Sequence, residues 1–348
     1  MTDSRPTLHE FRTLYKAAMR VKEIAPWEWM TETDVFGVEN PESNEIGFVS
    51  VMGMLGQHLA LALYPDTRAL YRFWDVHHMG GSAPPESVLE IPQLQASFEN
   101  RDQLSREDRH VMRELGLTFR GRQAWPMFRS YRPGYFPWYV EAAEARFLTH
   151  ALEQTVDVAL RFKEDPAILT PSDDDDDDYL VRVPRKKGSP RVWEDRIVTV
   201  EPPEPMPIQV TIDVGTLDEL RRLPRSRHVI EMDFFMVPAP VQEKGARPYF
   251  PYVLLAVESD TGMVVGCELL KPGLTIEATW ALVPNSVAQQ LSKLEIVPHH
   301  ISVESLLLAD LLQPLAEELG LDVTSTPILP SLDEARESFL GHFYDGAV

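Results

Sequence analysis

Val229-Ile-Glu-Met-Asp-Phe-Phe-Met-Val237 is the stretch that decides the fold of the C-terminal half of this 348-residue chain. Its β-branched and aromatic residues predict a buried strand. Residues 252–257 and 263–270 have the same character, and Ser259-Asp-Thr-Gly262 between them predicts a tight turn. We therefore expect three antiparallel strands in succession.

Alternating helices and strands follow this meander. We expect a helix at 276–294 that is interrupted near Pro284, a strand at 300–303, a helix at 306–319 closed by Gly320, a strand at 321–324, and a final helix that begins with the capping-box pair Ser331 and Glu334. Crossover connections of this kind add parallel strands to a sheet with right-handed geometry. The predicted order is βββαβαβα.

Residues 226–345 are similar in this order to the ribonuclease H-like fold shared by nucleases, integrases and transposases. The resemblance implies a site in which carboxylates hold two divalent metal ions, Mg²⁺ or Mn²⁺. The first acid lies in the middle of the first strand, where this chain has Asp233. The second follows the fourth strand, where Glu304 replaces the expected aspartate, and the third comes from the last helix, as Glu334 or Glu337.

Two observations weigh against a working metal site. A glutamate carries its carboxylate roughly one C–C bond further out than an aspartate, whereas the two metals of such a site stand only about 3.5–4 Å apart. Residues 206–348 also hold 9 Lys and Arg against 20 Asp and Glu, a net charge of -11 that repels phosphate. The alternative is that these acids are solvated groups at strand ends and in the first turn of a helix.

Residues 1–200 predict a separate α+β domain. Thr7 and Glu10 have capping-box spacing ahead of an apolar helical stripe. Residues 35–38 and 46–51 predict a hairpin, and residues 141–163 predict a long helix with one apolar face. The fold class is thus α+β in the first domain and α/β in the second.

Two segments divide the chain. Residues 164–178 contain six consecutive aspartates and predict a solvated acidic loop, because like charges repel and resist packing. Residues 201–207, Glu-Pro-Pro-Glu-Pro-Met-Pro, predict an extended linker because proline fixes φ and removes backbone donors. We expect the domain boundary there, with the second domain at 208–348.

The composition excludes several classes of protein. A net charge of -21 argues against nucleic acid as a partner, since phosphate contacts need clustered Lys and Arg. No apolar run approaches the roughly 18 residues of a membrane span, and no secretory signal opens the chain. Cys267 is the single cysteine and lies in an apolar run, so we expect a buried, inert thiol in a cytoplasmic protein.

Aromatic residues provide one further candidate site. Trp27, Trp29, Trp125 and Trp138 could stack a ligand while Arg129 or Arg132 fixes an anion. Packing in the core is the alternative, because aromatic side chains bury large areas.

The whole chain also resembles a bacterial family of uncharacterised proteins that pairs two domains of unknown function. The residues that carry this resemblance are Ala25-Pro-Trp-Glu-Trp29, Glu45-Ile-Gly-Phe48 with Met52-Gly53, Arg132-Pro-Gly-Tyr135 and Arg247-Pro-Tyr-Phe-Pro251. We expect a non-catalytic cytoplasmic bacterial protein, without a cofactor, that binds a partner protein or a small ligand. The alternative is a metal-dependent nuclease, or a degenerate relative of one.

Overall fold

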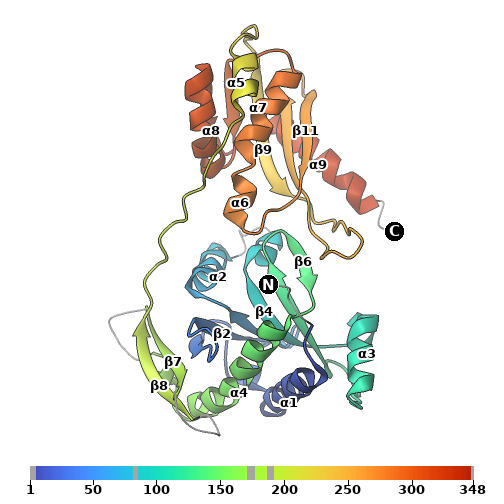
Figure 1. The fold of residues 1–348 in the computed structure, drawn as a ribbon, viewed down its shortest axis with the longest axis vertical. Coiled ribbons are helices and arrows are strands. Elements are labelled where there is room, and N and C mark those ends of the chain that lie inside the picture. The colour runs from blue at the N-terminus through green and yellow to red at the C-terminus, as the bar shows by residue number, and fades with distance from the viewer. Residues whose placement is uncertain (1–4, 81–84, 171–176, 186–191, 346–348) are drawn as a thin grey trace. The chain divides into compact units, whose positions relative to one another are not determined.

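The computed structural model describes residues 5–80, 85–170, 177–185 and 192–345. The chain forms two compact units (Figure 1). Unit 1 contains Met1–Arg132 and Pro137–Glu204, and unit 2 contains Pro133–Phe136 and Pro205–Val348. Each unit has its own mixed sheet and its own helices, so the chain is a mixed α+β protein.

Unit 1 is built on an eight-stranded sheet in the order β6-β5-β4-β3-β2-β1-β7-β8. Its strands are β1 (Phe36–Glu39), β2 (Ile46–Met52), β3 (Ala60–Tyr64), β4 (Gln93–Glu99), β5 (Trp125–Arg132), β6 (Tyr135–Trp138), β7 (Asp178–Pro184) and β8 (Trp193–Thr199). Strand β7 pairs in parallel with β1. Strands β1 to β5 pair antiparallel, each with the next along the chain.

Helices cover both faces of this sheet. They are α1 (Leu8–Ile24), α2 (Thr67–Met79), α3 (Arg106–Glu114) and α4 (Ala142–Glu164), with short 3₁₀ turns at Pro26–Glu28, Pro85–Glu90, Arg101–Gln103 and Pro166–Leu169. The apolar stripes of α1 and α4 share one core with alternate residues of β1 to β4. Helix α2 packs with a second core that includes Phe48 and Val181, on the opposite face.

Unit 2 is built on a five-stranded sheet in the order β11-β10-β9-β12-β13. Its strands are β9 (Val229–Met236), β10 (Tyr252–Glu258), β11 (Val264–Leu270), β12 (His300–Val303) and β13 (Asp322–Ser325). Strands β9 to β11 are antiparallel, while β12 runs parallel to β9 and β13 runs parallel to β12. Strand β9 is therefore the centre of the sheet.

The helices of unit 2 are α5 (Val214–Leu220), α6 (Ile276–Trp280), α7 (Val283–Lys293), α8 (Leu306–Leu319) and α9 (Pro330–Asp345). Helix α9 packs Leu332 against Val253 and Leu255 of β10. Helix α7 lies over the other face, because Gln290 Nε2 donates to the carbonyl of Leu254 and its side chain stands where a Cβ on Gly266 would project. Figure 1 shows α7 and α9 on opposite sides of the sheet.

Several sequence expectations need correction. Strands β4, β5 and β6 were not predicted from the sequence. Helix α9 begins at Pro330, and Ser331 does not cap it: the Ser331 hydroxyl donates to the carbonyl of Ser259. Cys267 is exposed, because β11 is an edge strand.

The predicted acidic loop is only partly described. Residues 173–176 of the aspartate run lie outside the described residues. Asp177 accepts a hydrogen bond from the Tyr71 hydroxyl at 3.2 Å, and Asp178 begins β7. These last two aspartates of the run are thus part of the folded unit.

Candidate functional site

Asp233 lies in the middle of β9, the central strand of unit 2, and is 7% exposed. The parallel register pairs Met232 with Val303, the last residue of β12. Glu304 is the next residue after Val303, as Asp233 is after Met232, so Glu304 lies beside Asp233 at the end of β12. The sheet thus brings the first two candidate acids close together.

Arg336 of α9 occupies the space between these two carboxylates. Its Nη1 lies 3.0 Å from Asp233 Oδ2 and 3.5 Å from Glu304 Oε2. Its Nη2 donates to Asp333 Oδ1 at 2.8 Å, one turn earlier on the same helix. One guanidinium group therefore contacts three carboxylates from three elements, and we call these four residues the Arg336 cluster.

A second buried acid holds the start of α9 on the sheet. Glu231 has the same orientation as Asp233, because alternate residues of a strand face the same side. Its Oε2 accepts a hydrogen bond from the backbone N–H of Leu332 at 2.8 Å, and its Oε1 accepts one from the Ser259 hydroxyl at 3.0 Å. Backbone donors in the first turn of a helix have no partner within the helix, so Glu231 satisfies one of them.

The electrostatic environment of Asp233 is dominated by burial. Burial raises the pKa of this carboxyl above its ordinary value, while the Phe234 amide and the positive charge of Arg336 oppose the shift. The nearby carboxylate of Glu304 raises the pKa further. The Phe234 amide and Arg336 therefore both stabilise the ionised form of a carboxylate that water scarcely reaches.

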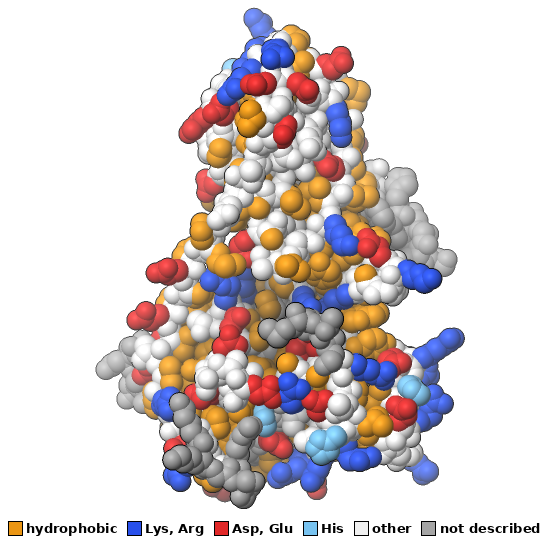
Figure 2. Space-filling model, viewed as in Figure 1, with side chains coloured by type: hydrophobic (Ala, Val, Ile, Leu, Met, Phe, Trp, Pro, Cys, Tyr) orange, Lys and Arg blue, Asp and Glu red, His pale blue; other side chains and the backbone are white. Residues whose placement is uncertain are grey.

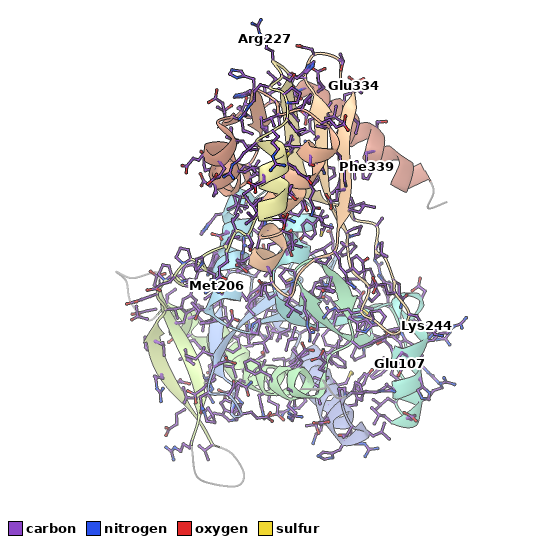
Figure 3. The ribbon with its side chains drawn as sticks, turned by 45° about the horizontal axis from the view of Figure 1, so that its top comes forward. Glu107, Met206, Arg227, Lys244, Glu334 and Phe339 are labelled. Atoms are coloured by element: carbon purple, nitrogen blue, oxygen red, sulfur yellow. The ribbon has the colours of Figure 1, made fainter. Side chains whose placement is uncertain are left out.

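The third predicted acid does not join the cluster. Glu334 and Glu337 are both exposed on α9, and Glu334 is labelled in Figure 3 with Phe339 of the same helix. The acid that α9 contributes is Asp333, which lies three residues before Arg336 and so faces the same side. The sequence shows Asp333 and Arg336 at this spacing, but nothing in the pattern alone connects them to β9.

The residues present do not fit a two-metal centre. Asp233 and Glu304 already share the guanidinium group of Arg336, which stands where a cation bridging them would bind. Among the residues that the structure describes, no group of three or more His, Cys, Asp or Glu side chains is arranged to hold a metal ion. No metal-dependent step can be written for this geometry without moving Arg336.

Trp27 and Trp29, two of the four tryptophans singled out in unit 1, have packing roles. Trp27 is buried against Phe98, and Trp29 Nε1 donates to the carbonyl of Ala159 at 3.0 Å. Arg129 pairs through both Nη atoms with Asp108, and Arg132 pairs with Glu141 and Glu144. The two arginines proposed to fix an anion are thus engaged by carboxylates of the chain itself.

Comparison with protein families divides the sequence in the same two parts. Residues 11–182 match a family described as a domain of unknown function (DUF7309), and residues 216–340 match a second family described as a domain of unknown function (DUF6930). No protein with a curated description matches the sequence. Within the described residues, no helix is both long and apolar enough to cross a membrane.

Two solved structures have weak similarity to the chain. A simian T-cell lymphotropic virus intasome in complex with the PP2A regulatory subunit B56 gamma is 16% identical, with a TM-score of 0.25, over 36% of this chain and 43% of that chain. The catalytic core domain of BIV integrase is 17% identical, with a TM-score of 0.23, over 35% of this chain and 74% of that chain. The chain thus spans less than half the length of the first of these proteins.

Proposed function

We propose that this chain is a non-catalytic binding protein of the bacterial cytoplasm, in which a ribonuclease H-like unit 2 has an arginine in place of its metal ions. The sheet of unit 2 supports the topology, because its first strand is central, its second and third are antiparallel, and its fourth and fifth are parallel. The positions of Asp233 and Glu304 support the relation to a carboxylate site.

The observation that carries the proposal is the contact of Arg336 with both acids. A divalent metal activates water by lowering the pKa of the bound molecule. A guanidinium group has no coordination sphere for water and stays protonated in proteins, so it provides neither a hydroxide ion nor a general base. It does neutralise the buried acid, which is a structural role.

The second candidate function is a metal-dependent nuclease, and the meeting of Asp233 with Glu304 is the observation that favours it. Catalysis would then require Arg336 to leave both acids, and Glu334 or Glu337 to turn toward the sheet. The net charge of -21 opposes the approach of a polyanionic substrate. The described geometry therefore favours the non-catalytic role.

A nuclease assay tests the proposal. We expect the full chain, with Mn²⁺ or Mg²⁺, to cleave single- and double-stranded DNA and RNA no faster than its Asp233→Asn variant. Arg221→Met is the matched control, because Arg221 also pairs with two acids of unit 2, Asp218 and Glu318, but at an exposed site. Metal-dependent cleavage that is present in the wild type and in Arg221→Met, and lost in Asp233→Asn, would establish the nuclease instead.

A further inference from the structure

A cavity of about 530 Å³ in unit 1 is lined by four arginines, Arg101, Arg106, Arg109 and Arg113, together with apolar residues that include Met112 and Trp125. Its volume is within the range of small-molecule sites. Figure 2 shows Lys and Arg side chains gathered over α3, which carries three of the four arginines. We call these residues the arginine pocket.

The arginines converge because of helical spacing. Arg106, Arg109 and Arg113 are three and four residues apart on α3, so their side chains leave the same face of the helix. Arg101 belongs to the 3₁₀ turn before α3, and its guanidinium carbon lies 5.9 Å from the ring centre of Trp125. Four positive groups from two elements therefore border one cavity.

The acids of α3 are committed to other partners. Glu107 pairs with Arg5, Asp108 pairs with Arg129, and Glu114 lies 3.6 Å from His110. Within the part of the chain that the structure describes, no carboxylate stands within ion-pair distance of the four pocket arginines. The positive charge of these four arginines is therefore not offset by a neighbouring acid, although acids outnumber bases in the chain by 54 to 33.

Only part of the hydrogen-bonding capacity of these arginines is used. Arg109 Nε donates to the carbonyl of Ser105 at 3.2 Å, and Arg113 Nε donates to the carbonyl of Arg109 at 3.3 Å. These bonds use the inner nitrogens and leave the outer pair of each group for a ligand. Like charges at this spacing also destabilise a helix, so a bound anion would relieve their repulsion.

The apolar part of the pocket indicates what else the ligand carries. Met112 is buried, and Leu117 and Trp125 are half-buried. Phe119 holds the Trp125 ring from the side, with ring centres 5.8 Å apart. A flat apolar wall beside several guanidinium groups suits a planar ring joined to a charged group, because arginine binds phosphate through two parallel N–H bonds.

We infer that the arginine pocket binds a small molecule that carries a planar ring and two or more phosphates, the chemistry of a nucleoside diphosphate. The outer nitrogens of Arg106, Arg109 and Arg113 hold the phosphates, and the ring packs on the half-buried side chains of Leu117 and Trp125. The inference gives a ligand class to the binding role proposed above. It uses no residue of the Arg336 cluster, so the nuclease assay and the binding test fail independently.

Calorimetric titration of the full chain tests this inference with ADP, pyrophosphate, inorganic phosphate and adenosine as probes. We expect ADP to bind most tightly, pyrophosphate more weakly, and adenosine without measurable heat. Raising the salt from 0.15 M to 0.5 M should weaken ADP binding several-fold, because the main contacts are ionic. Binding of pyrophosphate as tight as that of ADP would remove the ring from the ligand class.

Variants locate the site. Arg109→Gln and Arg113→Gln should each weaken ADP at least about tenfold, the loss expected for a hydrogen bond to a charged group. Trp125→Leu should weaken ADP but leave pyrophosphate unchanged. Arg120→Gln is the matched control, since Arg120 is an exposed arginine near α3 that does not line the pocket. Arg109→Gln and Arg113→Gln should melt at or above the wild-type temperature, because they remove repulsion between like charges and no ion pair.

Three results would overturn the inference. The first is no binding of any phosphate probe at millimolar concentration by folded protein. The second is an equal loss in Arg120→Gln, which would indicate a diffuse attraction of anions to the surface. The third is tight binding of an acidic peptide in the absence of nucleotide binding, which would make the arginines a protein contact.

Discussion

Arg336 Nη1 donates a hydrogen bond of 3.0 Å to Asp233 Oδ2, across 103 positions of sequence. This bond joins the last helix of the chain to the central strand of the second sheet. The same helix packs Leu332 on that sheet, and Phe339 lies edge-on to Phe235 with ring centres 6.5 Å apart. Apolar contacts of α9 with the sheet, at Leu332 before Arg336 and at Phe339 after it, therefore hold Arg336 in position.

Removing Arg336 should destabilise unit 2. Arg336→Met keeps much of the side-chain volume but leaves the buried Asp233 with the Phe234 amide as its remaining donor. We expect the free energy of unfolding to fall by about 2 kcal/mol, less than the loss from a fully buried pair because Arg336 is 30% exposed. Urea unfolding followed by circular dichroism measures this change.

The control and the rescue make that experiment specific. Arg221→Met should lower the free energy of unfolding much less than Arg336→Met does, as expected for an exposed pair. Adding Asp233→Asn to Arg336→Met should restore part of the stability, because a neutral amide no longer needs the cation. Equal losses in the two arginine variants, with no rescue, would show that the Arg336 contact contributes nothing specific.

The ion pair of Asp108 with Arg129 should affect how the free energy of unfolding changes at acidic pH. Burial alone would raise the pKa of Asp108, but hydrogen bonds and charge from Arg129, with hydrogen bonds from Ser105, hold that pKa below its usual value. A carboxyl with a lowered folded pKa stabilises the protein above its unfolded pKa, near 3.9, and this stability is lost as the pH falls through the folded pKa.

Asp108→Asn should therefore cost about 3 kcal/mol at neutral pH, because both partners are nearly buried, and should flatten the loss of stability below about pH 4. Glu114→Gln, an exposed acid on the same helix, is the control and should leave the acid limb unchanged. Unfolding free energies measured between neutral pH and pH 2.5 check this. An unchanged acid limb in Asp108→Asn would contradict the expectation.

The two units should separate by proteolysis near residues 201–213. No residue of this segment is buried and none belongs to a helix or strand, so its backbone is accessible to a protease. We expect limited thermolysin digestion, followed by mass spectrometry, to yield a stable fragment that begins near residue 206, because thermolysin cleaves before apolar residues and Ile208, Val210 and Ile212 lie in this segment. An unfolded 206–348 fragment would show that the boundary is misplaced or that the units share a core.

The order of elements in unit 2 could be read from the sequence because its strands and helices have clear periods. Runs such as 229–237 are apolar enough to predict strands, and Pro284 marked the break between α6 and α7, where it lies in the first turn of α7. The contact of Arg336 with Asp233 and Glu304 could not be read from that order, because Arg336 meets them only through the docking of α9.

The strands of unit 1 were harder to predict for a different physical reason. Strand β5 alternates between buried and half-buried residues, but two of its buried positions are Pro126 and Ser130, which carry little hydrophobic signal. The aromatic residues around it therefore left two interpretations open, a ligand platform and packing in the core. The spacing of Arg106, Arg109 and Arg113 is present in the sequence, but an overall charge of -21 does not indicate a local basic face.

The most direct test of the central claim is calorimetric titration of Mn²⁺ into the wild type, Arg336→Met, and the double variant Arg336→Met with Asp233→Asn. If Arg336 takes the place of a metal, the wild type should show no binding tighter than about 1 mM, because the guanidinium already neutralises both acids. Arg336→Met should gain Mn²⁺ binding, and the double variant should lose it again. Sub-millimolar binding by the wild type that disappears in Asp233→Asn alone would contradict the account.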